Sequence, residues 1–571
     1  MKEIELRFQI PPSQWAAVHR WVNGEEDAPG AGAHRERLRA SYFDTPTRDL
    51  ARAGFALRLR LEGDTWVQTL KGAAPDGMTR LEHNVPVAGD APVLDLGRHA
   101  DHPAGQALQV LLDRLGSPTL QALFRTDIER LSRAFSTPFG DVELALDQGA
   151  LLAGEFPEER RTPVSELEIE LKQGDPRAVL EVAREWALHR FGLTLELRTK
   201  ALRGDLLARG EAAAPAQASG PASWRAGQTQ AQALTTLLQS VVEPLLGNAS
   251  QIITGIHQPE HLHQLRVALR RLRVGADLLV AAVQTDRGGA APHGEPDHAV
   301  VGGPGAEVEA VAVTVTDEDL LALRSLGEGA RQLGRLLTAA RDADAQALAG
   351  WRRDLERAWQ QAPMPTRPDA TPVLPAAVDG PTPGQLLAEP LWQDWMLSIV
   401  AWLVRGWPSQ APAEAVLSVV EQMGDKALHL ARRFDKLDVE GRHHLRRRLR
   451  RWKMALEMTA QLQGGGRESE ARSAAPHSGK GHKSSKAQAA RVELPRRVAR
   501  QLARVQEVQK PLGELNDLEV GLAQARASLV RAVAAGAAGE AARAAFELGW
   551  LTPLRNEALT RMRRRVKRLK R

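Results

Sequence analysis

The sequence has 571 residues, no cysteine, 43% hydrophobic and 26% charged residues, and a formal net charge of +6. This length predicts several domains, and the composition is that of a globular chain. The lack of cysteine excludes disulfides, thiolate metal sites and a cysteine nucleophile. The longest apolar stretch, 396–404, is too short to span a membrane. We therefore expect a cytoplasmic protein with no membrane partner.

The chain opens with MKEIELRFQI, in which Glu3, Glu5 and Arg7 alternate with apolar residues. Alternation with a period of two predicts a strand with one charged and one apolar face. The ordinary interpretation is that the charged face lies in water. The alternative is that it points into a site that needs carboxylates and a cation together.

Three later segments up to about residue 205 repeat this pattern. Their charged faces carry Arg58 and Arg60, then Glu143 and Asp147, then Glu166, Glu168, Glu170 and Lys172. Like charges on one strand face repel each other unless a counter-charge or a metal ion lies between them. In a barrel with these faces inward, carboxylates could bind divalent cations and guanidinium groups could bind phosphate.

The composition changes after the first 205 residues. An Ala-, Pro- and Gly-rich stretch predicts a linker at 206–225, and a helical pattern follows over 226–571. Three stretches within the helical part are predicted to be disordered insertions, at about 286–316, 362–383 and 464–490.

The helical part contains an internal repeat. HQLRVALRRLR, beginning at His263, matches HHLRRRLRRWK, beginning at His443. A second pair, RDAD at 341–344 and NDLE at 516–519, follows in the same order at nearly the same offset. The order indicates two related helical subdomains. We place them at about 226–361 and 385–571.

Each copy predicts a helix with a basic stripe beside an apolar stripe. The basic stripes contain His263, Arg266, Arg270 and Arg273 in the first copy and His443, Arg446, Arg450 and Lys453 in the second. One such stripe alone would be read as a solvated helix face. Its repetition favours a surface that binds phosphate groups without reading bases, so we expect no sequence-specific nucleic acid as a partner.

The first 205 residues resemble the CYTH family, the triphosphate tunnel metalloenzymes. Glu3-x-Glu5-x-Arg7 is similar to the ExExK opening of that family. Further similar motifs follow in the family's order: YFDT at 42–45, LRLR at 57–60, QTLK at 68–71, ELALDQG at 143–149, ELEIELK at 166–172 and Thr199-Lys200. The resemblance implies an eight-stranded antiparallel β-barrel, the tunnel, in a multidomain α+β protein whose C-terminal part is an all-α duplicated helical bundle.

The resemblance also implies roles for the charged residues. Glu3, Glu5, Glu168 and Glu170 are the implied ligands of Mg2+ or Mn2+, and Arg7, Arg58, Arg60, Lys71, Arg130 and Lys200 are the implied phosphate ligands. The groups implied to orient the attacking water or to support the metal ligands are Asp147, Glu143, Glu166 and Glu82. Arg125 differs in parity from Arg130, so only one can point inward from a regular strand, and we favour Arg130. Arg7 has a planar guanidinium group where the family usually has the ammonium group of a lysine, so the role of that lysine cannot be assigned directly to Arg7.

The helical part resembles the CHAD domain, through the stripe motif and LGELNDLEV at 512–520. That resemblance implies binding of inorganic polyphosphate through a basic channel. We therefore expect metal-dependent hydrolysis of inorganic triphosphate to pyrophosphate and phosphate, in a protein that associates with polyphosphate granules. Three alternatives stay open: thiamine triphosphatase, class IV adenylyl cyclase, and a non-catalytic polyphosphate-binding protein.

Overall fold

A computed structural model of the chain defines the fold. It describes residues 4–25, 32–73, 80–90, 92–155, 158–220, 230–289, 316–339, 350–362, 380–405, 413–460 and 496–569. Most of the three predicted insertions lies outside these residues, as do Glu3 and the RDAD motif of the first repeat.

The chain divides into two compact units. The first consists of Met1–Gln217, Pro244–Leu265 and Thr382–Arg405, and the second of Ala218–Glu243, Arg266–Pro381 and Gly406–Arg571. The first unit therefore includes helical segments that the sequence pattern groups with the C-terminal part. The predicted linker begins late in a helix, because α5 (Lys200–Arg209) continues to Arg209.

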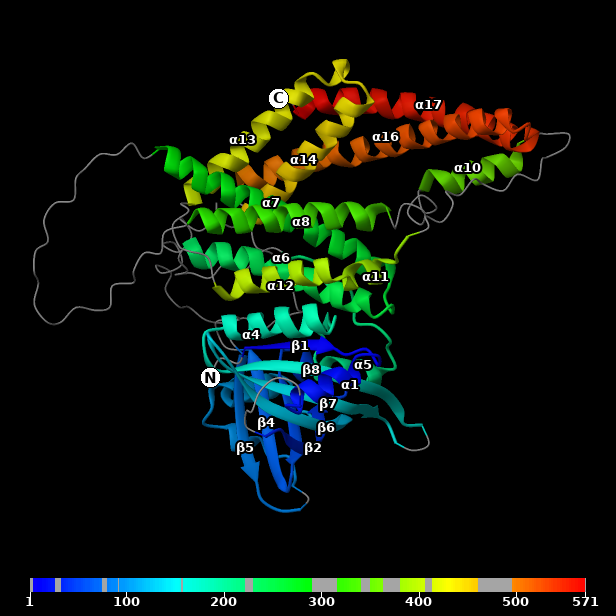
Figure 1. Cartoon of the computed structure of the whole chain (residues 1–571). Helices are drawn as coiled ribbons and strands as arrows, with labels where there is room; N and C mark the ends of the chain where they lie inside the picture. The colour runs from blue at the N-terminus through cyan, green and yellow to red at the C-terminus, as the bar shows by residue number, and fades with distance from the viewer. Residues whose placement is uncertain are drawn as a thin grey trace, which may run out of the picture. The chain divides into compact units, whose positions relative to one another are not determined.

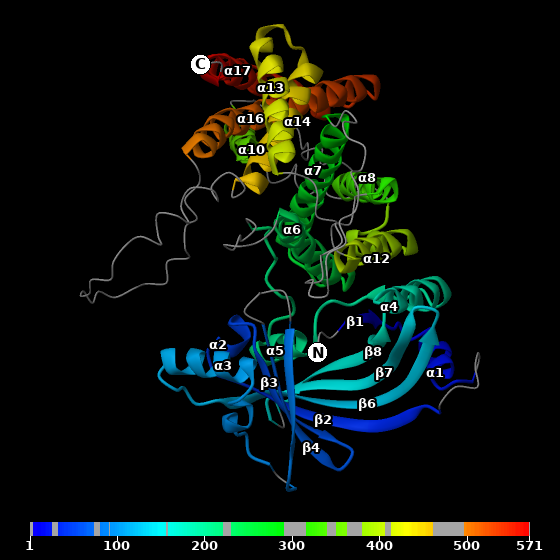
Figure 2. The same ribbon diagram turned by 90° about the vertical axis from the view of Figure 1, so that its left-hand side faces the viewer.

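One antiparallel sheet forms the centre of the first unit (Figure 1). Its strands are β1 (Glu5–Gln9), β2 (His34–Asp44), β3 (Ala56–Glu62), β4 (Thr65–Ala73), β5 (Arg80–Val87), β6 (Gln121–Thr137), β7 (Gly140–Ala153), β8 (Arg160–Gly174) and β9 (Thr194–Leu195). The order is β5-β4-β3-β2-β6-β7-β8-β1-β9. Figure 2 shows that the sheet curls strongly.

This sheet confirms the predicted α+β class and antiparallel pairing and corrects two details. It has nine strands among the described residues rather than eight, because the two-residue β9 adds to the edge of β1. It is also not closed there, since β5 and β9 are the two ends of the strand order. The sheet is therefore tunnel-like rather than a closed barrel.

The first unit also contains helices, and α5 packs on the inner face of the sheet rather than the outer one. The helices are α1 (Trp15–Val22), α2 (Asp49–Arg52), α3 (Pro103–Arg114), α4 (Arg177–Val182), α5, α11 (Pro383–Ala388) and α12 (Pro390–Arg405), with the short η1 (Leu96–His99) and η2 (Ala183–Arg190). Leu6, Phe8, Leu167 and Ile169 alternate with charged residues and are buried beneath α1 and α4. Their burial fixes the charged residues on the opposite face of the sheet.

The second unit is helical. It contains α8 (Asp317–Ala339), α10 (Gly350–Gln361), α13 (Ala413–Arg432), η3 (Phe434–Lys436), α14 (Val439–Thr459), α16 (Arg496–Ala534) and α17 (Ala538–Leu569), with parts of α6 (Gln230–Ile253) and α7 (Pro259–Gly289). The two repeated motifs of the second copy contact each other, since His443 Nδ1 lies 2.8 Å from Asn516 Oδ1. No helix among the described residues is long and apolar enough to cross a membrane.

Candidate active site

Charged residues lie in rows across three neighbouring strands. Glu5 on β1 is opposite Glu170 on β8, and Glu170 is opposite Glu143 on β7. In the next row, Arg7 is opposite Glu168. All five share the sheet face that turns away from the apolar core, as the period of two predicts. The rows place carboxylates and cations from segments distant in the sequence on one inner surface.

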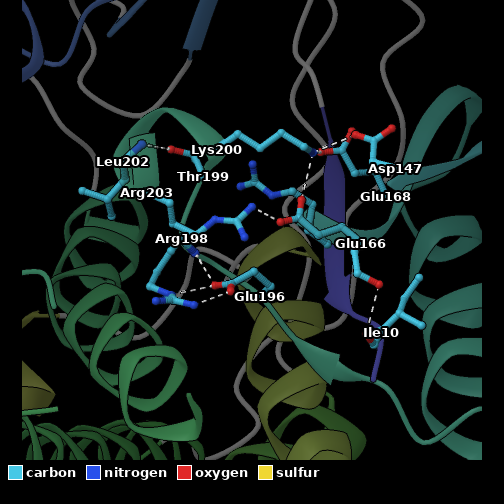
Figure 3. A network of polar contacts seen from close by, with 12 residues as sticks. Ile10, Asp147, Glu166, Glu168, Glu196, Arg198, Thr199, Lys200, Leu202 and Arg203 are labelled. Atoms are coloured by element: carbon cyan, nitrogen blue, oxygen red, sulfur yellow. Dashed lines mark hydrogen bonds and ion pairs between the residues drawn. The ribbon is translucent and has the colours of Figure 1, made fainter. Parts of the chain in front are cut away.

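Lys200 is the centre of this surface (Figure 3). Its amine lies 2.8 Å from an oxygen of Asp147, 2.8 Å from Glu166 and 2.7 Å from Glu168. The side chain projects from the first turn of α5, whose N-cap residue Thr199 accepts a hydrogen bond from the backbone of Leu202. Burial alone lowers the pKa of Lys200, but the charges of Glu168 and Asp147 outweigh it and raise the pKa. The amine is therefore protonated at neutral pH.

Arg130 joins the same cluster. Its guanidinium donates two hydrogen bonds of 2.7 Å to Asp147 and a third of 2.5 Å to Glu168. Burial raises the pKa of Glu168, but the charges of Lys200, Arg130 and Arg7 outweigh it and hold the pKa well below its ordinary range. Arg125 instead pairs with Glu159 and is half exposed. The parity argument thus selected the arginine that reaches the cluster.

Arg203 was not singled out from the sequence. It forms an ion pair with Glu166, whose side chain is fully buried. Burial, together with the positive charge of Arg7, lowers the pKa of Arg203 to about 10. Lys200 and Arg203 are three residues apart on α5 and so share a helix face, which is the signal that would have found this residue.

The opposite side of the inner surface is rich in cations. Arg58 on β3 is partly buried and donates a hydrogen bond of 3.2 Å to the hydroxyl of Tyr42. Burial and the neighbouring charge of Arg58 lower the pKa of Arg60. The amine of Lys71 on β4 lies 2.9 Å from Glu82. The buried Nε of Arg58 has no hydrogen-bond partner, which fits a site that receives an acceptor from a ligand.

The predicted metal ligands are only partly brought together. Among the described residues, no group of three or more His, Asp or Glu side chains is close enough to hold a metal ion, and Glu3 lies outside them. Glu5 and Glu170 face each other with side chains 27% and 30% exposed. Their oxygens are the donors that Mg2+ and Mn2+ prefer. Glu168, by contrast, is held by Lys200 and Arg130.

Lys172 provides a counter-charge for these carboxylates. Its amine lies 2.9 Å from Glu170 and 3.2 Å from Glu143. Arg7 lies 3.5 Å from Glu5, so the residue that departs from the ExExK pattern still touches the carboxylate row. The donor set fits a divalent cation in kind, since Glu5 and Glu170 supply hard carboxylate oxygens opposite each other.

The predicted basic stripes show their expected sidedness. The leucines beside both stripes are buried: Leu262, Leu265, Leu269 and Leu272 on α7, and Leu445 and Leu449 on α14. In the second unit, burial and the charges of Arg446, Arg266 and Arg447 lower the pKa of Arg450 to about 10. Arginines from both copies are therefore close enough to repel one another.

Other stripe residues have individual surroundings. Burial and the charge of Arg451 lower the pKa of Arg273, and Lys453 pairs with Glu457 at 2.9 Å. The buried part of the first stripe includes the Nε of Arg270. His263 is exposed and belongs to the first unit, unlike the residues of α7 that follow it from Arg266 onward.

Comparison with known proteins gives a family match to the residues that form the sheet. The family model of the CYTH domain matches residues 1–203, so this part of the chain is a CYTH domain. An inorganic triphosphatase from Haemophilus influenzae is 31% identical over 172 residues, which are 29% of this chain and 45% of that protein. The match thus spans less than half the length of this curated relative.

Two solved structures share weaker likenesses. The CHAD domain from the plant Ricinus communis is 20% identical, with a TM-score of 0.37, over 62% of this chain and 96% of that one. A putative adenylyl cyclase from Hippeastrum, described as having a dominant triphosphatase activity, is 18% identical, with a TM-score of 0.24, over 37% and 97%.

Proposed function

We propose that the CYTH domain hydrolyses inorganic triphosphate to pyrophosphate and phosphate with a divalent metal ion. The observation that carries this proposal is the inner surface of the sheet, where a carboxylate row on β7, β8 and β1 faces arginines and a lysine from β3 and β4. Cleavage of a phosphoanhydride requires both a metal site and cations for the phosphate oxygens. The relative named inorganic triphosphatase supports the same reaction class.

The residues of the chain divide the work as follows. Arg58, Arg60 and Lys71 bind phosphate oxygens, and the buried Nε of Arg58 has no hydrogen-bond partner and can donate to one. Glu5 and Glu170 hold Mg2+ or Mn2+, which supplies charge neutralisation and an acidified water when bound. The protonated amine of Lys200 stabilises negative charge that develops on the transferred group, because its raised pKa keeps it charged.

The carboxylates around Lys200 position groups and protons. Asp147 and Glu168 hold Arg130 and Lys200 at fixed places, so these cations need no reorganisation when substrate arrives. The low pKa of Glu168 keeps this carboxylate ionised, and an ionised carboxylate on the inner surface is suited to orient a water molecule.

The substrate proposed here has no base. The chain has a single tyrosine, Tyr42, and its ring is buried and stacked on Phe124 at 4.5 Å. Its hydroxyl accepts a hydrogen bond from Arg58, so the ring packs beside this cation and is not available to stack a base. This arrangement favours inorganic triphosphate over thiamine triphosphate and ATP.

The test is release of phosphate from inorganic triphosphate, ATP and thiamine triphosphate, each with Mg2+, with Mn2+ and with a chelator. We expect inorganic triphosphate to be turned over fastest and the chelator to stop the reaction. If none of the three substrates is hydrolysed with either metal, the enzyme proposal is wrong and a phosphate-binding role is favoured.

For the helical part we propose binding of inorganic polyphosphate, as the resemblance to CHAD implies. The supporting observation is the mutual repulsion of Arg266, Arg446, Arg447 and Arg450, which a polyanion would relieve. Polyphosphate binding should therefore fall steeply with salt, which a titration of the full chain at several ionic strengths would measure.

A further inference from the structure

The edge strand β9 is short and lies directly before the residues that lead to Lys200. One of its edges pairs with β1: Leu195 is opposite Phe8, and the backbone of Glu196 donates a hydrogen bond of 2.7 Å to the carbonyl of Arg7. Because successive N–H groups of a strand point in opposite directions, those of Leu195 and Leu197 point away from β1. A buried N–H group without a partner is costly, so these two groups need acceptors.

Side chains from distant helices supply both acceptors. The N–H of Leu195 donates to Oε1 of Gln393 on α12 at 2.8 Å, and the amide of Gln393 donates in turn to the carbonyl of Leu387 at 2.8 Å. The N–H of Leu197 donates to the hydroxyl of Ser250 on α6 at 3.1 Å. Both helices lie outside residues 1–203, yet these parts of them belong to the same compact unit as the sheet.

The same contacts fix a buried carboxylate. Ser250 donates to Glu196 at 2.9 Å, and Glu196 is only 3% exposed. Glu196 also accepts hydrogen bonds from the backbone N–H of Arg198 and from two nitrogens of its guanidinium, at 2.9, 3.0 and 2.7 Å. Thr199 follows as the N-cap of α5, and Lys200 is the first residue of that helix. Figure 3 shows Glu196 bound to Arg198 and, a short stretch of chain further on, Lys200 among its carboxylates.

We propose that Ser250 and Gln393 are positioning residues for Lys200, so that α6 and α12 complete the triphosphate site of the CYTH domain. They hold 195–198 against β1, and the start of α5 then places the amine of Lys200 among Asp147, Glu166 and Glu168. The catalytic part of this inference rests on the proposed function. Its structural part, the environment of the Lys200 amine, does not.

The test compares Gln393→Leu and Ser250→Ala in the full chain with Ser398→Ala. Ser398 is a matched control because it lies on α12 and bonds Arg184 at 3.1 Å, but it does not contact β9. We expect kcat on inorganic triphosphate to fall roughly 10- to 100-fold in the first two variants, with little change in KM. Ser250→Thr keeps the hydroxyl and should keep the wild-type kcat.

A second readout needs no turnover. The rate at which an acylating reagent modifies Lys200 at a fixed pH, followed by peptide mass spectrometry, reports how accessible its amine is. We expect faster modification in Gln393→Leu and Ser250→Ala than in the wild type, and no change in Ser398→Ala or Ser250→Thr.

The two readouts separate the possible failures. If wild-type protein hydrolyses no triphosphate, the proposed function fails while the modification rates still test the positioning. If Lys200 reacts identically in Ser250→Ala, Ser250→Thr and the wild type, with all three folded by circular dichroism, the positioning inference is overturned.

Discussion

The inner surface of the CYTH domain and the basic surface of the helical unit both contain clustered lysines and arginines, but the charges around those cations differ. In the former, Lys200 contacts three carboxylates and Arg130 contacts two. In the latter, Arg450 is surrounded by arginines, which together with burial lower its pKa. Paired charges are held in place and suit one small substrate of fixed geometry. Clustered like charges favour any partner that brings negative charge, so they suit a long polyanion.

The largest expected effect is a loss of triphosphate turnover without any loss of polyphosphate binding. Glu5→Ala removes one of the two exposed carboxylates that face each other on β1 and β8, and we expect triphosphate turnover to fall by roughly 10³-fold or more. Polyphosphate binding by the same variant should be unchanged. Glu129→Ala, at an exposed position on the same sheet, is the control. Loss of both functions in Glu5→Ala would show that the two surfaces are not independent.

Lys200→Met tests whether charge pairing is what organises the site. The substitution leaves Asp147, Glu166 and Glu168 without their shared amine, two of them fully buried. We expect kcat to fall about 10²- to 10³-fold. Denaturant unfolding should show a loss of about 3–5 kcal/mol, as for broken buried ion pairs. Lys436→Met, at an exposed lysine of the helical unit, should change neither quantity. Normal turnover in Lys200→Met would contradict the proposal that this amine stabilises negative charge during the reaction.

The helical unit is tested by Arg266→Ala combined with Arg446→Ala. Removal of two neighbouring cations should weaken polyphosphate binding about tenfold at moderate salt and reduce the slope of log K against log salt by roughly 1.4–1.8. Arg504→Ala with Arg526→Ala, two exposed positions on α16, gives a control of equal charge change. If both double variants have the same slope, the basic stripes are ordinary solvated helix faces and do not bind polyphosphate.

The smallest effect concerns a cluster of three histidines in the CYTH domain. The Nδ1 atoms of His83 and His99 lie 2.9 Å apart, and the His102 ring stacks on His83 at 4.5 Å. Burial, then the charges of His83 and His102, lower the pKa of His99 to about 4. The unfolded state therefore binds more protons, so stability is present above about pH 6.5 and is lost as the pH falls towards 4.

Urea unfolding at pH 7 and pH 5 would measure this loss. In His99→Gln the difference between the two pH values should shrink, whereas in His34→Gln, at an exposed histidine of β2, it should equal that of the wild type. Equal pH dependence in all three proteins would contradict the assignment to His99.

The sequence predicted which side chains face inward but not which of them meet. Alternation with a period of two depends on local backbone geometry alone, so the charged faces of β1, β3 and β8 could be read directly, and parity selected Arg130. Pairing across the sheet depends on register between distant segments. The contact of Arg203 with Glu166 is therefore a property of the assembled structure, although the helical spacing from Lys200 hinted at it.

The same limit explains why the sequence pattern groups α6 and α12 with the C-terminal part, whereas the first compact unit contains segments of both. Composition and periodicity classify α6 and α12 as helices like those around them, since their sequences carry no mark of what they cover. Leu397 packs into the core beneath the sheet, and Gln393 binds β9. A glutamine in this mostly apolar segment was the available signal, because such a side chain requires a polar partner once it is buried.

The hydrogen bond between Leu195 and Gln393 also affects how the protein folds during its synthesis. The two residues are 198 positions apart. At typical rates of translation, the ribosome needs roughly 10–40 s to make that length of chain. During this interval the N–H groups of β9 face no acceptor from α12, and the edge of the sheet is open to pairing with another nascent chain. The CYTH domain therefore reaches its final form only after most of the protein has been synthesised.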